Sequence, residues 1–413
     1  MKIMTVSDSP TLFTGLARVH RELLNHFAGK HELVPCCWHM RDSIELTEIN
    51  AGNQVPDRFH EHNGVKTKLI AVPKANGNNC MFSIYDLIES EKPDVVLTIG
   101  DYFDFWYMKA IKEKLDYSFK WVPYLTIEHD EFDKRSDIYK VADEVIVPSE
   151  YGRRVVKEKW SIEAHVVPYG IDPRFKPTGQ RSDEGPTKFL CVAQNTWRKM
   201  LPVLLQAFQR TEELCECELY LHTNVHATDP QEAYLFDLKS IVSKLGLKNV
   251  RFPGDDKYFC IFDSPGDDYM AQAYNQADFL VSSSICEGYG LPVVEAMACG
   301  CPLAGSGTST LYEHVGMKFG DYGLGLRGYL SKPRLEICPP DRMMSFPSIN
   351  SLSDAMVSMA VLRERAPDKL EGMRERCLEY ARGLAWDVTG RQIEAIVSKA
   401  AKAPVTIPVE NVV

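Results

Sequence analysis

The sequence predicts an α/β protein with two domains, each a parallel sheet covered by helices. At 413 residues the chain exceeds one core of ordinary size. Short β-rich runs alternate with helix-like segments in both halves, as in sheets covered by helices. A segment rich in Pro, Gly and charge, 171–187, interrupts this alternation. We therefore expect two Rossmann-like domains that face each other across a cleft.

The first domain, 1–172, begins with an apolar strand at 1–7. The segment Gly15–Ala28 follows, with apolar residues at helical spacing. Further β-rich runs lie at 31–38, 68–72, 93–99, 121–127 and 144–147. The carboxyl ends of parallel strands are where such domains bind ligands, so functional residues are expected there.

The second domain, 185–385, repeats the pattern and is followed by a tail helix, 386–402. Its β-rich runs lie at 188–192, 217–221, 250–252 and 279–282. Helices are expected from Leu201 and from Tyr269 to Ala277, the second capped by Asp268.

Composition limits the location and the partners. Apolar residues make up 45% and charged residues 25% of the chain, as in globular proteins. No apolar run approaches the roughly 20 residues that span a bilayer, and 1–7 is a poor secretory signal, so a cytoplasmic location is expected. The net charge of −10 disfavours a nucleic-acid partner without excluding one. Without a basic amphipathic helix, no stable membrane association is expected.

The segment 282–314 carries the chemistry. A strand ends near 284, and Pro292 suits the first turn of a helix, into which Glu295 also falls. Backbone N–H groups at Gly290 and Leu291 would then favour a phosphate. Glu287 and Glu295, eight positions apart, could accept hydrogen bonds from the paired hydroxyls of a sugar and a ribose. The pattern indicates a nucleotide-sugar site; otherwise Glu295 caps the helix and Glu287 is a solvated loop residue.

The run EGYGLPVVEAMACGCP, with its Glu287-x7-Glu295 spacing, resembles the signature of glycosyltransferase family 4. These are retaining enzymes of the GT-B fold that need no metal. The resemblance implies that Glu287 contacts the donor sugar and that Glu295 binds the ribose. The same loop would supply further donor contacts, from Gly288, Tyr289, Gly290 and Leu291. It also implies that 1–172 takes the acceptor, that 185–385 takes the donor, and that 386–402 crosses back to the first domain.

A basic pair lies early in the second domain. The segment 192–208 resembles the place where the family sets an arginine and a lysine against the donor diphosphate. Lys199 matches the lysine, whereas the arginine position falls on Gln194 and Arg198 stands beside Lys199. We assign the diphosphate to Arg198 and Lys199, because a dianion in a cleft needs nearby cations. The alternative is a solvated pair at the start of a helix.

Other expected contacts are weaker. Of the family's Gly-rich loop after the first strand, only Gly15 remains, and it is assigned to the donor. The family commonly has a histidine near the transferred sugar after the run 121–127. Here Glu128 precedes His129, so both are candidates. Phe252 and Gly254 lie where the family reads the base.

We therefore expect a retaining transferase that moves a sugar from a UDP- or GDP-sugar to a hydroxyl of a glycan or glycoconjugate, without a metal or other cofactor. The compact chain and its substituted motifs are similar to short virus- or phage-encoded members. Some of these act on hydroxylated DNA bases, which would place the protein in a host cytoplasm. A non-catalytic sugar-nucleotide-binding protein and a hydrolysing or epimerising enzyme are the remaining alternatives.

Overall fold

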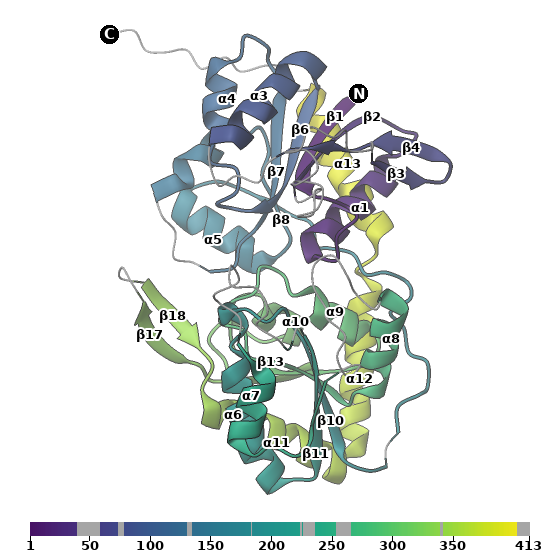
Figure 1. Cartoon of the computed structure of the whole chain (residues 1–413), viewed down its shortest axis with the longest axis vertical. Helices are drawn as coiled ribbons and strands as arrows, with labels where there is room; N and C mark the ends of the chain where they lie inside the picture. The colour runs from purple at the N-terminus through teal and green to yellow at the C-terminus, as the bar shows by residue number, and fades with distance from the viewer. Residues whose placement is uncertain are drawn as a thin grey trace.

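Two α/β domains make up the structure (Figure 1). The computed structural model describes residues 1–38, 58–72, 78–129, 134–182, 184–223, 225, 236–252, 266–338 and 342–402. Between the domains, residues 172–182 and 184–186 form no helix or strand.

The N-terminal domain is built on a parallel sheet with the strand order β5-β2-β1-β6-β7-β8-β9. Its strands are β1 (Lys2–Asp8), β2 (Glu32–Trp38), β5 (Ile70–Ala71), β6 (Val95–Asp101), β7 (Lys120–Thr126), β8 (Ile146–Val147) and β9 (His165–Val166). A separate hairpin pairs β3 (Phe59–His62) with β4 (Val65–Lys68). The predicted runs thus became neighbouring strands, and β9 is an additional short strand.

Helices cover both faces of this sheet. They are α1 (Gly15–Phe27), α3 (Asn78–Glu91), α4 (Met108–Lys114), the 3₁₀ helix η1 (Lys134–Val141) and α5 (Glu150–Trp160). The Thr14 side chain caps α1 by accepting a hydrogen bond from the N–H of Ala17 at 3.1 Å. Val19, Leu23 and Phe27 lie on one face of α1 and are fully buried in the core.

The C-terminal domain repeats this architecture, with the strand order β12-β11-β10-β13-β14-β16-β15. Its strands are β10 (Thr187–Val192), β11 (Cys217–His222), β12 (Val250–Arg251), β13 (Phe279–Ser282), β14 (Leu303–Ser306), β15 (Gly323–Leu324) and β16 (Gly328–Ser331). Only the β15–β16 pair of this sheet is antiparallel among the described residues. A hairpin of β17 (Arg334–Cys338) and β18 (Arg342–Phe346) was not predicted.

The helices of this domain are the 3₁₀ helix η2 (Trp197–Lys199), α6 (Leu201–Leu214), α7 (Leu238–Leu245), α8 (Asp267–Gln276), α9 (Leu291–Ala298), α10 (Leu311–Val315), α11 (Ile349–Arg365) and α12 (Pro367–Arg382). The prediction that Asp268 caps α8 is wrong. The helix begins one residue earlier, at Asp267, and its N-cap is Gly266, whose φ of +87° suits a residue without a side chain.

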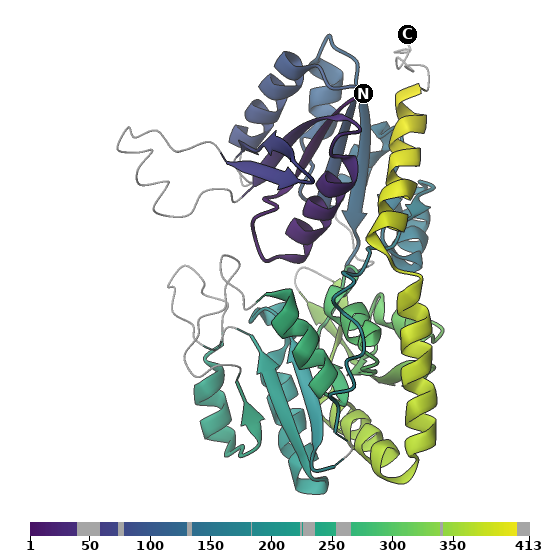
Figure 2. The same ribbon diagram turned by 90° about the vertical axis from the view of Figure 1, so that its right-hand side faces the viewer.

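The last helix, α13 (Trp386–Lys402), returns to the N-terminal domain, where it packs beside α1, β6 and β7 (Figure 2). Its predecessor α12 packs on α9 of the C-terminal domain. The chain therefore crosses between the domains twice. None of the helices in the described part of the chain combines the length and apolar composition needed to cross a bilayer.

Direct contacts also join the two domains. The Glu313 carboxylate of α10 accepts hydrogen bonds from the backbone N–H groups of Glu150, at 3.0 Å, and Tyr151, at 3.3 Å. These groups belong to the first turn of α5, where N–H groups lack partners inside the helix. Tyr289 donates a hydrogen bond to the carbonyl of Tyr169 at 3.2 Å. The C-terminal domain thus satisfies polar groups of the N-terminal domain.

We expect Gly390→Ala in α13 to destabilise the protein by about 1–3 kcal/mol, the usual effect of overpacking. An added Cβ there would lie 2.4 Å from Cγ of His26, which is itself held by Glu394 at 2.7 Å. The matched control is Gly372→Ala in α12, where the nearest atom to an added Cβ is a flexible Arg376 nitrogen at 3.5 Å. That variant should gain about 0.5–1 kcal/mol from better helix propensity. Thermal melting of both compares them; equal melting temperatures would contradict the packing argument.

Candidate active site

The candidate site lies where the C-terminal sheet reverses its order. The strands β11 and β12 extend the sheet on one side of β10. The next strand in the sequence, β13, pairs with β10 on its other side, and β14, β16 and β15 follow outward from β13. A crevice at the carboxyl ends of such a strand pair is the usual ligand position in doubly wound sheets. A small pocket occurs at this place, between 191–193 at the end of β10, 280–284 at the end of β13 and the start of α9. Lys199 and Glu287 both line it.

Two glycines of the predicted signature shape the loop between β13 and α9. An added Cβ on Gly288 would lie 2.9 Å from Cβ of Thr126, at the end of β7 in the other domain. Gly290 is the N-cap of α9 and has a φ of +89°, a conformation that L side chains rarely adopt. The first glycine lets the loop approach the N-terminal domain, and the second turns it into the helix.

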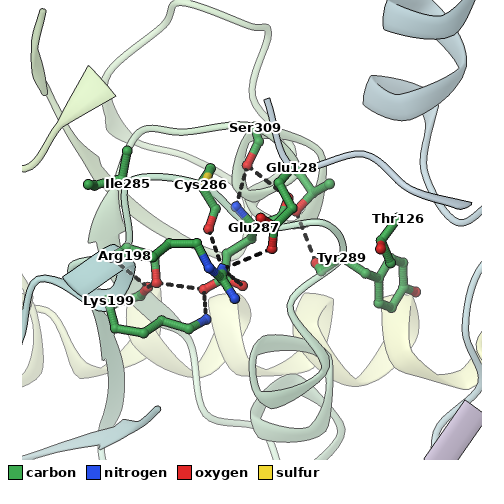
Figure 3. A network of polar contacts seen from close by, with 12 residues as sticks. Thr126, Glu128, Arg198, Lys199, Ile285, Cys286, Glu287, Tyr289 and Ser309 are labelled. Atoms are coloured by element: carbon green, nitrogen blue, oxygen red, sulfur yellow. Dashed lines mark hydrogen bonds and ion pairs between the residues drawn. The ribbon is translucent and has the colours of Figure 1, made fainter. Parts of the chain in front are cut away.

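Glu287 is the centre of a buried network (Figure 3). Its carboxylate accepts hydrogen bonds from Lys199 Nζ at 2.6 Å and Ser284 Oγ at 2.6 Å, and Arg198 lies 3.5 Å away. Its backbone N–H donates to Ser309 Oγ at 2.8 Å. Burial alone would raise the pKa of Glu287, but the two cations outweigh it and lower the pKa to about 2. Glu287 is therefore an ionised acceptor at neutral pH.

The basic pair stands on a short, constrained turn. Arg198 and Lys199 belong to η2, and the following Met200 has a left-handed φ of +49°, which is uncommon for a residue with a side chain. The carbonyl of Arg198 accepts the N–H of Ile285 at 2.9 Å, and that of Lys199 accepts Ser283 Oγ at 2.7 Å. Both bonds tie the turn to the loop that carries Glu287. The two cations are not a solvated pair.

Glu128 reaches the same network from the N-terminal domain. Its carboxylate lies 3.3 Å from Arg198, which also approaches Glu287. Burial raises the pKa of Glu128 to about 7, with Asp101 and Glu287 adding to the effect and Arg198 opposing it. The ring of His129 instead packs edge-on against Tyr102, with the ring centres 5.9 Å apart. Of the two candidates, Glu128 joins the network around Glu287.

Glu295 lies in a second buried cluster, on α9. Because the helix begins at Leu291, Glu295 occupies its second turn, and the prediction that it falls in the first turn is wrong. It therefore does not cap the helix. The residue is buried, and its carboxylate accepts hydrogen bonds from Tyr274 Oη at 3.0 Å and from Arg18 of the N-terminal domain.

The remaining predicted site residues lie in separate places in the structure. Gly15 begins α1, and its added Cβ would lie 3.4 Å from Leu291, so it meets the start of α9 across the domain boundary. Tyr289 is buried between Tyr169 and His314 and forms part of the interdomain packing. Phe252 packs partly against the C-terminal core. Gly254 lies outside the described residues.

Sequence reasoning missed several polar residues of these clusters: Arg18, Asp267, Tyr274, Ser284 and Ser309. In the sequence, Arg18 is simply a polar position of the predicted amphipathic helix, and nothing there indicates a partner in the other domain. The two serines belong to the singled-out segment 282–314, but nothing in their spacing indicates a partner.

The arrangement places the ionised carboxylate of Glu287, the cation Lys199 and the start of α9 around one pocket, with Arg198 3.5 Å from Glu287. Within the described ranges, no three His, Cys, Asp or Glu side chains are grouped to hold a metal ion. Carboxylates can bind sugar hydroxyls, and paired cations beside a helix start can bind a phosphate.

Sequence comparison finds relatives for part of the chain. Residues 174–335 match the family described as glycosyl transferases group 1. A curated relative, the MMP alpha-(1→4)-mannosyltransferase of Mycolicibacterium hassiacum, is 28% identical over 158 residues. The match covers 37% of this chain and 34% of that protein, so the chain spans about a third of the length of its curated relative.

Solved structures resemble the whole chain. Sucrose-phosphate synthase from Thermosynechococcus elongatus has a TM-score of 0.70 at 18% identity, over 97% of this chain and 98% of that one. Anabaena HepE in complex with UDP and glucose has a TM-score of 0.65 at 13% identity, over 97% of this chain and 100% of that one. A trehalose-6-phosphate protein of E. coli bound with UDP-2-fluoro glucose has a TM-score of 0.66 at 10% identity, over 98% of this chain and 100% of that one. The chain has the GT-B fold of glycosyltransferases, and its residues 174–335 match the group 1 glycosyl transferases.

Proposed function

We propose that the protein is a retaining glycosyltransferase of family 4 that moves a sugar from a UDP- or GDP-sugar to a hydroxyl group of an acceptor. One observation carries the proposal: Glu287 and Lys199 line the pocket at the β10–β13 switch point, and Arg198 lies 3.5 Å from Glu287. The group 1 match covers these residues, and HepE, of similar fold, was solved with UDP and glucose.

The donor would lie along the C-terminal domain. Its diphosphate would lie between Lys199, Arg198 and the start of α9, which neutralise the charge that develops as the diphosphate departs. These cations would take the place of a metal ion. Glu287 would accept hydrogen bonds from the sugar hydroxyls, and Glu295 from the ribose.

The acceptor would approach from the N-terminal domain. Glu128 is positioned for this role because it comes from the N-terminal domain and approaches the same Arg198 nitrogen as Glu287, at 3.3 Å. With a pKa of about 7 it can take up or release a proton at neutral pH. The acceptor would be a glycan or another hydroxyl-bearing molecule, encountered in the cytoplasm.

UDP or GDP should raise the melting temperature of the wild type, while ADP and NAD should not. A ligand at about 100 times its dissociation constant adds about 2.7 kcal/mol to the stability of the folded state. Glu295→Gln should reduce the shift, because an amide accepts fewer hydrogen bonds than a carboxylate. Glu371→Gln, on the exposed side of α12, is the control and should keep it. A full shift with Glu295→Gln would overturn the assignment of the ribose.

Lys199→Met should lower kcat/KM for sugar transfer about 10²–10³-fold, the usual loss when a group that stabilises developing negative charge is removed. Lys244→Met, which removes an exposed lysine at the end of α7, should leave kcat/KM unchanged. The measurement is initial-rate transfer from the nucleotide sugar that binds. Full activity of the Lys199 variant would contradict the role of the basic pair.

The activity should rise as the pH increases from 6 to 8. Glu128 is neutral below its pKa of about 7 and ionised above it, and only the carboxylate can accept the proton of an acceptor hydroxyl. Glu128→Gln should lower the plateau and remove the inflection. His129→Gln, which alters the neighbouring titratable side chain, should keep it. An inflection that disappears only with the His129 variant would transfer the role to that residue.

A further inference from the structure

Arg18 is the point where α1 of the N-terminal domain reaches the proposed ribose carboxylate. Its guanidinium donates from one terminal nitrogen to Glu295 and from the other to Asp267 at the start of α8. The side chain is 18% exposed, and its partners 8% and 15%. It also lies over the Phe175 ring, 5.6 Å from the ring centre. One side chain therefore joins both domains at a desolvated place.

The charges around Glu295 come from several elements. Arg18 lies on α1, Tyr274 and Asp267 on α8, and Asp172 in the linker. Arg174 of the linker pairs with both aspartates, at 2.7 Å each, and so is shared between them. Burial raises the pKa of Glu295, and Asp267 and Asp172 raise it further, whereas Arg18 and the Tyr274 hydroxyl lower it. Among the residues that the structure describes, Arg18 is the cation that forms an ion pair with this carboxylate.

Arg18 and a ribose can be bound at the same time. Each carboxylate oxygen can accept two hydrogen bonds. Glu295 Oε1 accepts from Arg18 and Oε2 from Tyr274, so each oxygen retains acceptor capacity. A vicinal diol needs an ionised carboxylate to receive both of its O–H groups, because a protonated carboxyl has become a donor on one side. The ion pair and the diol are therefore compatible partners of one side chain.

We propose that Arg18 is a positioning residue of the donor site, which holds Glu295 as the carboxylate that receives a ribose diol and thereby makes nucleotide affinity depend on the N-terminal domain. This inference rests on the proposed function. It assigns one residue of the proposed donor site to the N-terminal domain, from which the acceptor would approach.

The test is isothermal titration of the full chain with whichever of UDP or GDP the wild type binds, between pH 6 and pH 9. Arg18→Met keeps the bulk of the side chain and removes its charge. We expect it to weaken binding about tenfold or more at pH 7, and increasingly as the pH falls. Each unit by which the pKa of Glu295 exceeds the pH lowers its ionised fraction about tenfold. Arg21→Met is the control, because Arg21 lies on the same helix and donates instead to the carbonyl of Pro10 at 3.3 Å.

A double-mutant cycle separates a positioning role from a structural one. In the Glu295→Gln background, Arg18→Met should change the affinity less than about twofold, since the charge on which it acts is gone. A loss that is independent of pH, or equally large with and without Glu295, overturns the inference. Unchanged or tighter binding by Arg18→Met alone overturns it as well. A wild type that binds neither nucleotide instead refutes the proposed function, so the two failures are distinguishable.

Discussion

Two glutamates, eight positions apart and both nearly inaccessible to solvent, impose the main constraint on this structure. Burying an ionised carboxylate is costly unless a cation and hydrogen bonds compensate for the lost water. Glu287 obtains its cation inside the C-terminal domain, from Lys199 on η2. Glu295 obtains its cation from Arg18, in the other domain. The first pair requires η2 to lie beside the loop that carries Glu287. The second requires α1 of the N-terminal domain to lie beside α9, which carries Glu295.

The strands and the signature loop could be predicted because their signals are local. Apolar runs located β13 and the predicted helix at α1, and Gly290 and Pro292 located the start of α9. The partner of Glu295 could not be found in this way. Helical periodicity distinguishes buried from polar positions, but it does not tell a solvated arginine from one that crosses to another domain. The turn that holds Glu295 was misplaced because the helix starts directly after Gly290.

The two halves of the chain are related to known proteins in different ways. The group 1 match begins at residue 174 and ends at 335, whereas the likeness to sucrose-phosphate synthase and to the E. coli protein covers 97% and 98% of the chain. The motif resemblance in this part of the sequence pointed to Lys199 and Glu287, and the structure places these two side chains in contact. The N-terminal domain shares the architecture at low identity. Its contributions to the site, through Glu128 and Arg18, became visible only when the folded chain brought the domains together.

Arg198 lies between two carboxylates whose pKa values differ widely. Glu287 has Lys199 and a serine hydroxyl in addition, so it remains ionised, with a pKa of about 2. Glu128 has Arg198 as its nearest cation while Asp101 and Glu287 repel its charge, so its pKa rises to about 7. A diphosphate bound between Arg198 and Lys199 would add negative charge near Glu128 and raise that pKa further. Donor binding would then favour the protonated form of Glu128, which couples the two domains of the site through the one guanidinium that both carboxylates approach.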